Sequence, residues 1–212
     1  QENNIELIML KAGQAIPGDA KLVLIPGSKS TRGDLNFLRE QGWDIDLYAH
    51  YRRGGHILGL CGGYQMLGKQ IDDPDGLDGP AGRTEGLGLL DVKTEMLPEK
   101  TLRKITAIHR DSSLVVEGYE IHLGRTTGED CKQPFAYLDK EPEGACSTDG
   151  RISGSYLHGL FCSDGFRSAF LENLGVSGGD LKYEKNLDDV LNELAKHIED
   201  QLDVDALLEV AK

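Results

Sequence analysis

The stretch Gly59-Leu60-Cys61-Gly62-Gly63-Tyr64-Gln65-Met66-Leu67-Gly68 places a cysteine on a glycine-rich turn between an apolar segment and a segment with helical spacing. Residues 56–60 predict a short buried strand, and residues 64–71 predict a helix. Such a turn exposes a nucleophile at the carboxyl end of a sheet, and the helix N-terminus favours the thiolate. We therefore interpret Cys61 as a nucleophile. The alternative is a small buried hydrophobic side chain, which is the usual state of a free cysteine.

The composition of the whole chain limits the possible classes of function. The 212 residues carry a formal net charge of -13, which argues against a nucleic-acid-binding surface. No apolar run is long enough for a membrane span, and no signal peptide is evident. The four cysteines form no CxxC pair and no zinc-ligand spacing, so we expect no metal site. Cys131, Cys146 and Cys162 are expected to be reduced thiols of a cytoplasmic protein.

Hydrophobic periodicity predicts an α/β fold with a mostly parallel central sheet flanked by helices. We expect a domain over residues 1–175 and a C-terminal helical extension over residues 176–212, packed on the same domain. The predicted strands are residues 5–10, 21–25, 56–60, 87–92, 115–116, 119–122, 135–138 and 151–157. The predicted helices are residues 34–41, 45–53, 64–71, 166–174 and 186–202, and residues 72–85 are expected to form a long loop.

Three glycine-marked turns each follow a predicted strand: Pro26-Gly27-Ser28, Leu60-Cys61-Gly62 and Leu157-His158-Gly159. In a parallel sheet these turns lie along the same carboxyl edge, where ligands bind. Cys61 and His158 can therefore meet, with the histidine moving the proton of the thiol. The alternative for His158 is a structural histidine beneath a loop. His50, His109 and His197 are interpreted as surface residues, and the role of His122 stays open.

Five motifs resemble the glutamine amidotransferase domain of the cobyric acid synthase family, the cobalamin-pathway branch of the class I glutaminases. They span about residues 5–175 in the expected order. The matching segments are Pro26-Gly27-Ser28-Lys29-Ser30-Thr31 with Asp34-Leu35, residues 58–68, Gly86-Leu87-Gly88-Leu89-Leu90, Gly118-Tyr119-Glu120-Ile121-His122-Leu123-Gly124-Arg125 and Tyr156-Leu157-His158-Gly159-Leu160-Phe161. The resemblance implies a class I glutamine amidotransferase (flavodoxin-like) architecture.

The resemblance also implies roles for individual residues. Cys61 would attack the side-chain amide of L-glutamine, and His158 would act as base and then as acid to the leaving ammonia. Backbone N–H groups of Gly62 and of the Gly27-Ser28 loop would form the oxyanion hole. The substrate would be held by Gln65 and by the backbone of His122, Leu123 and Gly124.

The chain departs from the class pattern at the third catalytic position. Ordinary class I glutaminases place a glutamate two residues after the histidine, where this chain has Leu160. Either a dyad suffices, or another carboxylate orients His158, and Glu120 is the first candidate. The alternative for Glu120 is a strand residue that faces solvent.

A further strand and an ATP-dependent amide-forming domain precede the matching segment in this family. The resemblance therefore implies a glutaminase portion without cofactors of its own, and ATP and magnesium belong to the absent domain. The chain itself carries no GxxxxGK[ST] nucleotide loop. We expect exposed apolar surface beside residues 5–10 and 22–25, where the missing parts would lie.

Three alternatives remain for the function. Two are sister glutaminases with the same fold, which serve either corrinoid a,c-diamide synthesis or the amidation of a cell-wall lipid precursor. The third is a non-catalytic regulatory module on this fold. The motif at residues 118–125 favours the cobyric acid synthase family over both sisters, and the presence of both Cys61 and His158 speaks against a non-catalytic module.

Overall fold

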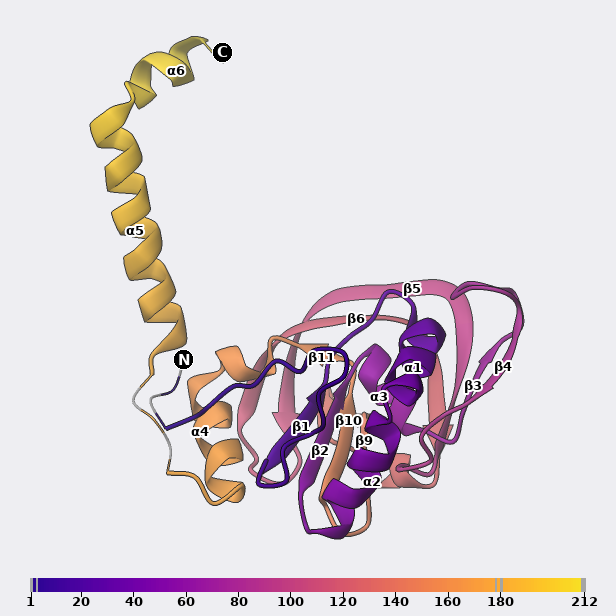
Figure 1. Ribbon diagram of the computed structural model, residues 1–212. Coiled ribbons are helices and arrows are strands. Elements are labelled where there is room, and N and C mark those ends of the chain that lie inside the picture. The colour runs from indigo at the N-terminus through magenta and orange to yellow at the C-terminus, as the bar shows by residue number, and fades with distance from the viewer. Residues whose placement is uncertain (1, 3, 178, 180, 211–212) are drawn as a thin grey trace. The chain divides into compact units, whose positions relative to one another are not determined.

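A computed structural model describes residues 2, 4–177, 179 and 181–210 (Figure 1). It divides the chain into one unit of Glu6–Gly178 and a second unit of Gln1–Ile5 with Gly179–Lys212. The first unit contains every residue of the predicted site. No helix among the described residues is long and apolar enough to cross a membrane.

A central parallel sheet carries the two strands that precede the predicted nucleophile and the oxyanion loop. Its strand order is β1 (Leu22–Ile25), β2 (His56–Leu60), β10 (Ile152–Ser155) and β9 (Ala145–Cys146). The β1–β2 and β2–β10 pairs are parallel, and β9 is antiparallel to β10. The register aligns the carboxyl ends of β1, β2 and β10, so the segments that follow them leave the sheet at the same edge.

The central strand β2 is buried on both faces. Ile57 packs into one core cluster with Leu35, Leu38 and Leu47 from helices α1 (Thr31–Glu40) and α2 (Trp43–Arg52). Its neighbour Leu58 belongs to a second cluster that includes Phe166 of helix α4 (Asp164–Asn173). Successive strand residues point to opposite faces, which explains why a continuous apolar run serves both clusters.

A second, largely antiparallel sheet adjoins the parallel sheet. The long strands β5 (Val92–His109) and β6 (Val115–Gly128) pair along most of their length. The sheet order is β11 (Leu157–His158), β6, β5, β3 (Gln70–Asp73) and β4 (Gly82–Glu85), and β7 (Ala136–Leu138) and β8 (Glu141–Glu143) join beside β5. The predicted α/β class with a parallel central sheet is confirmed. The second sheet is formed mainly by the middle third of the chain.

The segment predicted as one strand over residues 151–157 is divided between the two sheets. Residues 152–155 form β10 of the parallel sheet, and residues 157–158 form β11, which pairs with β6. Tyr156 lies at the junction. His158 therefore pairs with Tyr119 of β6 in the second sheet, three residues after β10 ends in the parallel sheet.

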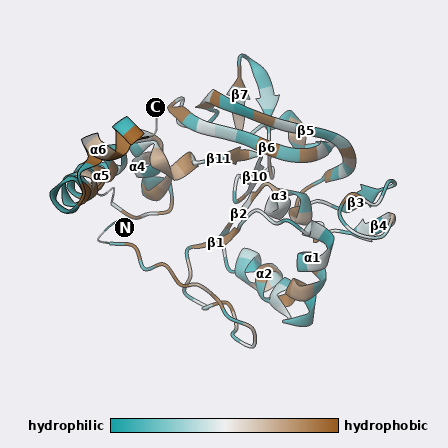
Figure 2. Ribbon diagram, turned by 90° about the horizontal axis from the view of Figure 1, so that it is seen from above, coloured by the Kyte–Doolittle hydropathy of each residue, from teal (hydrophilic) through white to brown (hydrophobic). Residues whose placement is uncertain are grey.

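Several predicted boundaries were wrong for local reasons. The helix after Cys61 is the short α3 (Gly62–Leu67), because Gly68 ends it and residue 70 already begins β3. The loop expected over residues 72–85 is a β3–β4 hairpin beside α1 (Figure 2). The buried Asp73 carboxylate stabilises its turn by accepting the backbone N–H groups of Leu77 and Asp78.

The N-terminal segment differs most from the expectation. Residues 5–10 form no strand, and β1 is the outer strand of its sheet among the described residues. Leu7, Ile8, Met9 and Leu24 are exposed, which agrees with the apolar surface expected here. The physical reason is that an extended segment without a partner strand cannot satisfy its backbone hydrogen bonds as a sheet.

Of the histidines assigned to the surface, His50 is buried and His109 is half-buried. His50 is 1% exposed, and its ring contacts the backbone oxygen of His56 at 2.9 Å. His109 packs edge-on against Phe135 and Phe166. His197 is exposed, as expected.

The C-terminal unit is helical. It contains α5 (Tyr183–Gln201) and α6 (Val204–Val210). In the first unit, Gly175 lies just after the end of α4 with a φ of 75°, as the sequence predicts for a helix-terminating glycine. The predicted extension over 176–212 includes residues 178, 180 and 211–212, which lie outside the described residues. Its packing on the first domain stays a prediction.

Candidate active site

Cys61 occupies a strained turn between β2 and α3. Its φ of 53° and ψ of -111° are rare for a residue with a side chain and cost on the order of 1–3 kcal/mol. The flanking glycines allow the close backbone approaches that hold this turn. A Cβ on Gly59 would lie 2.6 Å from the Gly63 carbonyl oxygen, and a Cβ on Gly63 would clash with the Ile25 carbonyl oxygen. The glycines are therefore required by packing around the nucleophile.

The Cys61 thiol is half-buried and donates to the Ile121 carbonyl oxygen of β6 at 3.2 Å. Burial raises the pKa of the Cys61 thiol, and the hydrogen bond to the Gly62 N–H lowers it only in part. The net direction is therefore opposite to the lowered pKa that the sequence suggested for a thiol at a helix N-terminus. The resting residue is therefore a thiol, and it needs a base.

His158 supplies a suitable group beside Cys61. A Cβ built on Gly27 would lie 3.5 Å from both the Cys61 Cβ and the His158 Cε1, so the three turns meet at one point. The Nε2 atom of His158 is buried and has no hydrogen-bond partner within the described part of the chain. Cys61 and His158 therefore both lie beside Gly27, and their pairing as nucleophile and base stays a prediction.

The Gly27-Ser28 loop lies directly over the start of α3. A Cβ on Gly62 would lie 2.9 Å from the Ser28 backbone nitrogen, so these two backbones touch. The Ser28 hydroxyl donates to Asp34 at 2.5 Å and accepts the Ser30 N–H, which fixes the loop. The Ser28 backbone nitrogen is thus held against Gly62, the residue that follows Cys61, and the oxyanion hole stays a prediction.

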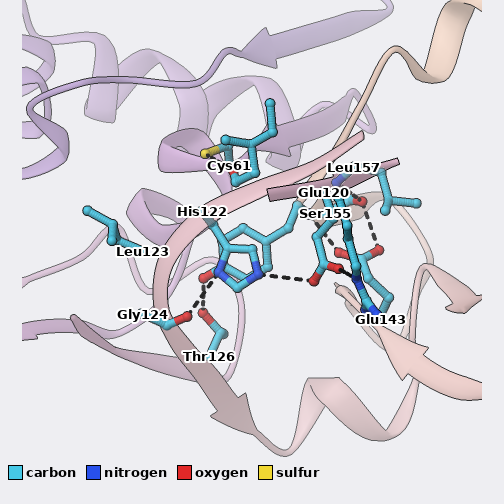
Figure 3. A network of polar contacts seen from close by, with 12 residues as sticks. Cys61, Glu120, His122, Leu123, Gly124, Thr126, Glu143, Ser155 and Leu157 are labelled. Atoms are coloured by element: carbon cyan, nitrogen blue, oxygen red, sulfur yellow. Dashed lines mark hydrogen bonds and ion pairs between the residues drawn. The ribbon is translucent and has the colours of Figure 1, made fainter. Parts of the chain in front are cut away.

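Glu120 lies on β6 but takes part in a different cluster. Its carboxylate accepts from Arg103 Nε at 2.5 Å. It also contacts His122 Nε2 at 3.0 Å (Figure 3). It is 8% exposed, so it is not the solvent-facing residue of the alternative interpretation. The structure does not bring Glu120 to the buried Nε2 of His158.

The remaining predicted residues lie where α3 contacts β6. Gln65 is 3% exposed, and its amide nitrogen donates to the Leu123 carbonyl oxygen at 3.0 Å. The His122 ring contacts the Gly124 carbonyl oxygen at 3.0 Å through Nδ1. The Gln65 amide is therefore engaged inside the protein, and the two side chains brace the strand segment proposed to clasp the substrate.

Comparison with known proteins agrees with this geometry. Residues 1–166 match the family model of the CobB/CobQ-like glutamine amidotransferase domain. The chain belongs to this family.

Curated relatives of this glutamine amidotransferase domain are longer proteins. The cobyric acid synthase of Bradyrhizobium diazoefficiens is 61% identical over 211 residues, and that of Rhodobacter capsulatus is 56% identical over 211 residues. Each match covers 100% of this chain and 44% of the relative, so the chain spans less than half of their length.

Solved structures of low identity share the fold. A glutamine amidotransferase crystal structure matches with a TM-score of 0.52 and 20% identity, over 74% of this chain and 80% of that chain. The structure of PurLQS from Thermotoga maritima matches with a TM-score of 0.52 and 16% identity, over 85% and 82% of the two chains. Both likenesses concern the architecture alone.

Two residues of this amidotransferase domain were missed by sequence reasoning. Tyr156 precedes the histidine motif, and its ring stacks on His122 with centroids 3.9 Å apart. Glu143 of β8 accepts the Tyr156 N–H at 2.6 Å and the Ser155 hydroxyl at 2.8 Å. Tyr156 was visible as part of a motif, but no local signal points to Glu143, which lies in a polar segment remote from every motif.

Burial raises the pKa of Glu143 from 4.5 to about 7, and the negative charge of Glu120 adds to this effect. The hydrogen bonds from Tyr156 and Ser155 oppose it without cancelling it. Both carboxylates line a cavity of about 650 Å³ together with His122, Thr126 and Tyr156. A buried acid in this cavity is thus half-protonated near neutral pH.

Replacing Glu143 by glutamine is expected to flatten the pH dependence of stability. The folded wild type holds an extra proton between pH 4.5 and about 7, so its free energy of unfolding decreases as pH rises through that window. Each pKa unit corresponds to about 1.4 kcal/mol, and each kcal/mol to about 2–4 °C in Tm. Thermal melts at pH 5.5 and pH 8 should show that the Tm of the wild type decreases between these two pH values. This decrease should be several degrees larger than the decrease for Glu143→Gln.

The exposed Glu141→Gln variant of the same strand is the matched control. It should keep the wild-type pH dependence. Equal pH dependence in wild type and Glu143→Gln would contradict the raised pKa.

Proposed function

We propose that this chain is the glutaminase domain of a cobyric acid synthase. It hydrolyses L-glutamine to glutamate and ammonia, and the ammonia is used for ATP-dependent amidation of carboxylate side chains on a corrinoid. The observation that carries the proposal is the convergence of Cys61 and His158 on Gly27. The names and high identity of the relatives support the choice of pathway.

The proposed reaction begins with proton transfer from Cys61 to His158. The thiolate attacks the side-chain amide carbon of glutamine, and the amide oxygen becomes an oxyanion that accepts the N–H groups of Gly62 and the Gly27-Ser28 loop. His158 returns the proton to the nitrogen, and ammonia leaves as the thioester forms. Water, deprotonated by His158, then attacks the thioester and releases glutamate and the free thiol.

The hydrogen bond from the thiol to Ile121 must break before this attack. The carbonyl dipole stabilises the protonated sulfur and opposes the thiolate. We expect bound glutamine to take its place along the edge of β6, where the predicted clasp of residues 122–124 lies. The unpartnered Nε2 of His158 is then free to take the proton.

The ATP-dependent step belongs to a part of the protein beyond this chain. The relatives are more than twice as long as the match, which leaves room for an amide-forming domain that binds ATP and magnesium. That domain would be the partner that takes up the ammonia. Four free thiols fit the cytoplasm as the place of the reaction.

The alternative functions are less well supported. The relatives quoted above are cobyric acid synthases and cover the whole chain. Neither corrinoid a,c-diamide synthesis nor the amidation of a lipid precursor has a comparable observation in its favour. A regulatory module without activity would have no need of a strained cysteine beside a histidine whose buried Nε2 has no hydrogen-bond partner among the described residues.

A glutamine-shaped electrophile, such as a diazo-ketone analogue of glutamine, is expected to label Cys61 selectively. The reason is that the oxyanion hole and the substrate clasp align only this sulfur with the reactive carbon. Peptide mass spectrometry should find Cys61 modified long before Cys131, Cys146 or Cys162. Preferential labelling of another cysteine would contradict the assignment, and excess glutamine should protect Cys61.

A coupled assay tests the proposed pathway. The complete polypeptide should consume glutamine and ATP in a fixed ratio when a corrinoid acid is present. If the polypeptide hydrolyses glutamine and amidates a lipid precursor but no corrinoid, the function in cell-wall precursor amidation would replace the proposed one.

A further inference from the structure

Tyr156 stands at the centre of a buried polar network that joins the three segments of the site. Its hydroxyl accepts from Gln65 Nε2 at 3.3 Å and contacts Thr126 Oγ1 at 2.5 Å. Thr126 in turn contacts Thr94 Oγ1 of β5 at 2.7 Å. On the other side, the Thr31 hydroxyl donates to Gln65 Oε1 at 3.2 Å. The network therefore runs from the start of α1 through α3 to strands β6 and β5.

The direction of the hydrogen bonds makes the Tyr156 hydroxyl indispensable to this network. Gln65 Nε2 can only donate, so the phenolic oxygen accepts from it and has one hydrogen left for Thr126. Tyr156 is 6% exposed, and burial raises the pKa of its hydroxyl to about 12, so it keeps that hydrogen. Phenylalanine at this position would leave a buried amide N–H and a threonine oxygen without this common partner.

The aromatic ring and the backbone of Tyr156 add three further contacts. The ring stacks on His122 at 3.9 Å and meets Tyr64 edge-on at 5.1 Å. The backbone N–H donates to Glu143. His158 follows Tyr156 by two residues. Cys61 precedes Gln65 by about one helical turn. A shift of Tyr156 would therefore move the nucleophile, the base and the β6 edge relative to one another.

We propose that Tyr156 is a positioning residue for glutamine hydrolysis, whose hydroxyl sets the distance between the nucleophile helix α3 and the substrate-binding edge of β6. The role rests on the proposed glutaminase function. It goes beyond packing, because the hydroxyl bridges Gln65 and Thr126, which come from the two sides of the site. Tyr156 contacts no reacting atom in this role.

Tyr156→Phe in the complete polypeptide tests the role, since it keeps the ring stack on His122 and removes only the hydroxyl. We expect kcat for glutamine hydrolysis to drop roughly 10-fold to 100-fold, as small misplacements in an active site do, with KM changed by less than about threefold. Alkylation of Cys61 by the glutamine-shaped electrophile should slow to a similar degree. Alkylation by iodoacetamide, which needs a reactive thiol but no aligned substrate, should keep its wild-type rate.

Tyr51→Phe is the matched control. It also deletes a tyrosine hydroxyl hydrogen bond, to Asp149 at 2.8 Å, but from α2 and away from the site. It should leave kcat unchanged. A kcat of Tyr156→Phe within threefold of the wild type, or equal slowing with both alkylating agents, would overturn the positioning role.

Thr126 provides an independent test should Tyr156→Phe fail to fold. Thr126→Val removes the hydroxyl partner on β6 and should lower kcat in the same way, whereas Thr126→Ser keeps that hydroxyl and should restore it. Equal activity of the two variants would refute the proposal. If the wild type neither hydrolyses glutamine nor reacts with the electrophile, the glutaminase function itself has failed.

Discussion

Replacing Cys61 by serine or alanine is expected to abolish glutamine hydrolysis while the protein stays folded. Serine is nearly the same size, so the turn between β2 and α3 and its contacts with Ile25 and Gly63 are retained. Its hydroxyl is a far weaker acid than the thiol, so serine forms a nucleophilic anion much less readily than cysteine. We expect ammonia release to fall to the uncatalysed level, measured by coupled detection of glutamate.

Cys162→Ser is the matched control for this experiment. It makes the same chemical change in a half-buried cysteine of the short 3₁₀ helix Leu160–Cys162 and should retain activity. ATP-dependent amidation with added ammonia should survive in Cys61→Ser, because that step does not use the thiol. Undiminished turnover of glutamine by Cys61→Ser would show that another residue is the nucleophile.

Replacing His158 by alanine is expected to lower kcat/KM for glutamine by about 10²–10⁴-fold at neutral pH, the usual contribution of a general base. The half-buried Cys61 thiol has a raised pKa and donates to a carbonyl oxygen, so it has little tendency to ionise alone. Without His158, the thiolate must form by loss of its proton to solvent. The residual rate of the variant should therefore increase with pH through and above the ordinary range of thiols.

The kcat/KM of the wild type should reach its maximum at a lower pH than the kcat/KM of the His158→Ala variant. A pH profile of kcat/KM for both proteins measures this difference. His197→Ala removes an exposed histidine from α5 and serves as the control. If kcat/KM decreases by less than tenfold, or if the wild type and His158→Ala have identical pH profiles, His158 is not the base of the proposed mechanism.

The local features of the site could be predicted because they depend on short segments. The glycines around Cys61 are required by backbone contacts within a few ångströms, so the nucleophile turn is recognisable from ten residues. Parallel strands bring their carboxyl ends to one edge, so the meeting of the turns at Gly27, Cys61 and His158 follows from the strand order of an α/β sheet. The absence of a glutamate at Leu160 is also visible in the sequence alone.

The sequence by itself thus predicted Cys61 as the nucleophile, His158 as the base and the edge of the sheet on which they are expected to meet. Tertiary structure decided what surrounds them. The contact of the Ile121 carbonyl with the thiol, the Arg103–Glu120 ion pair and the Tyr156–Thr126 contact join residues that are 60, 17 and 30 positions apart in the chain. Such contacts depend on the register of β5 against β6 and on the break between β10 and β11, which is set by long-range pairing and burial and leaves no periodic pattern in any one segment.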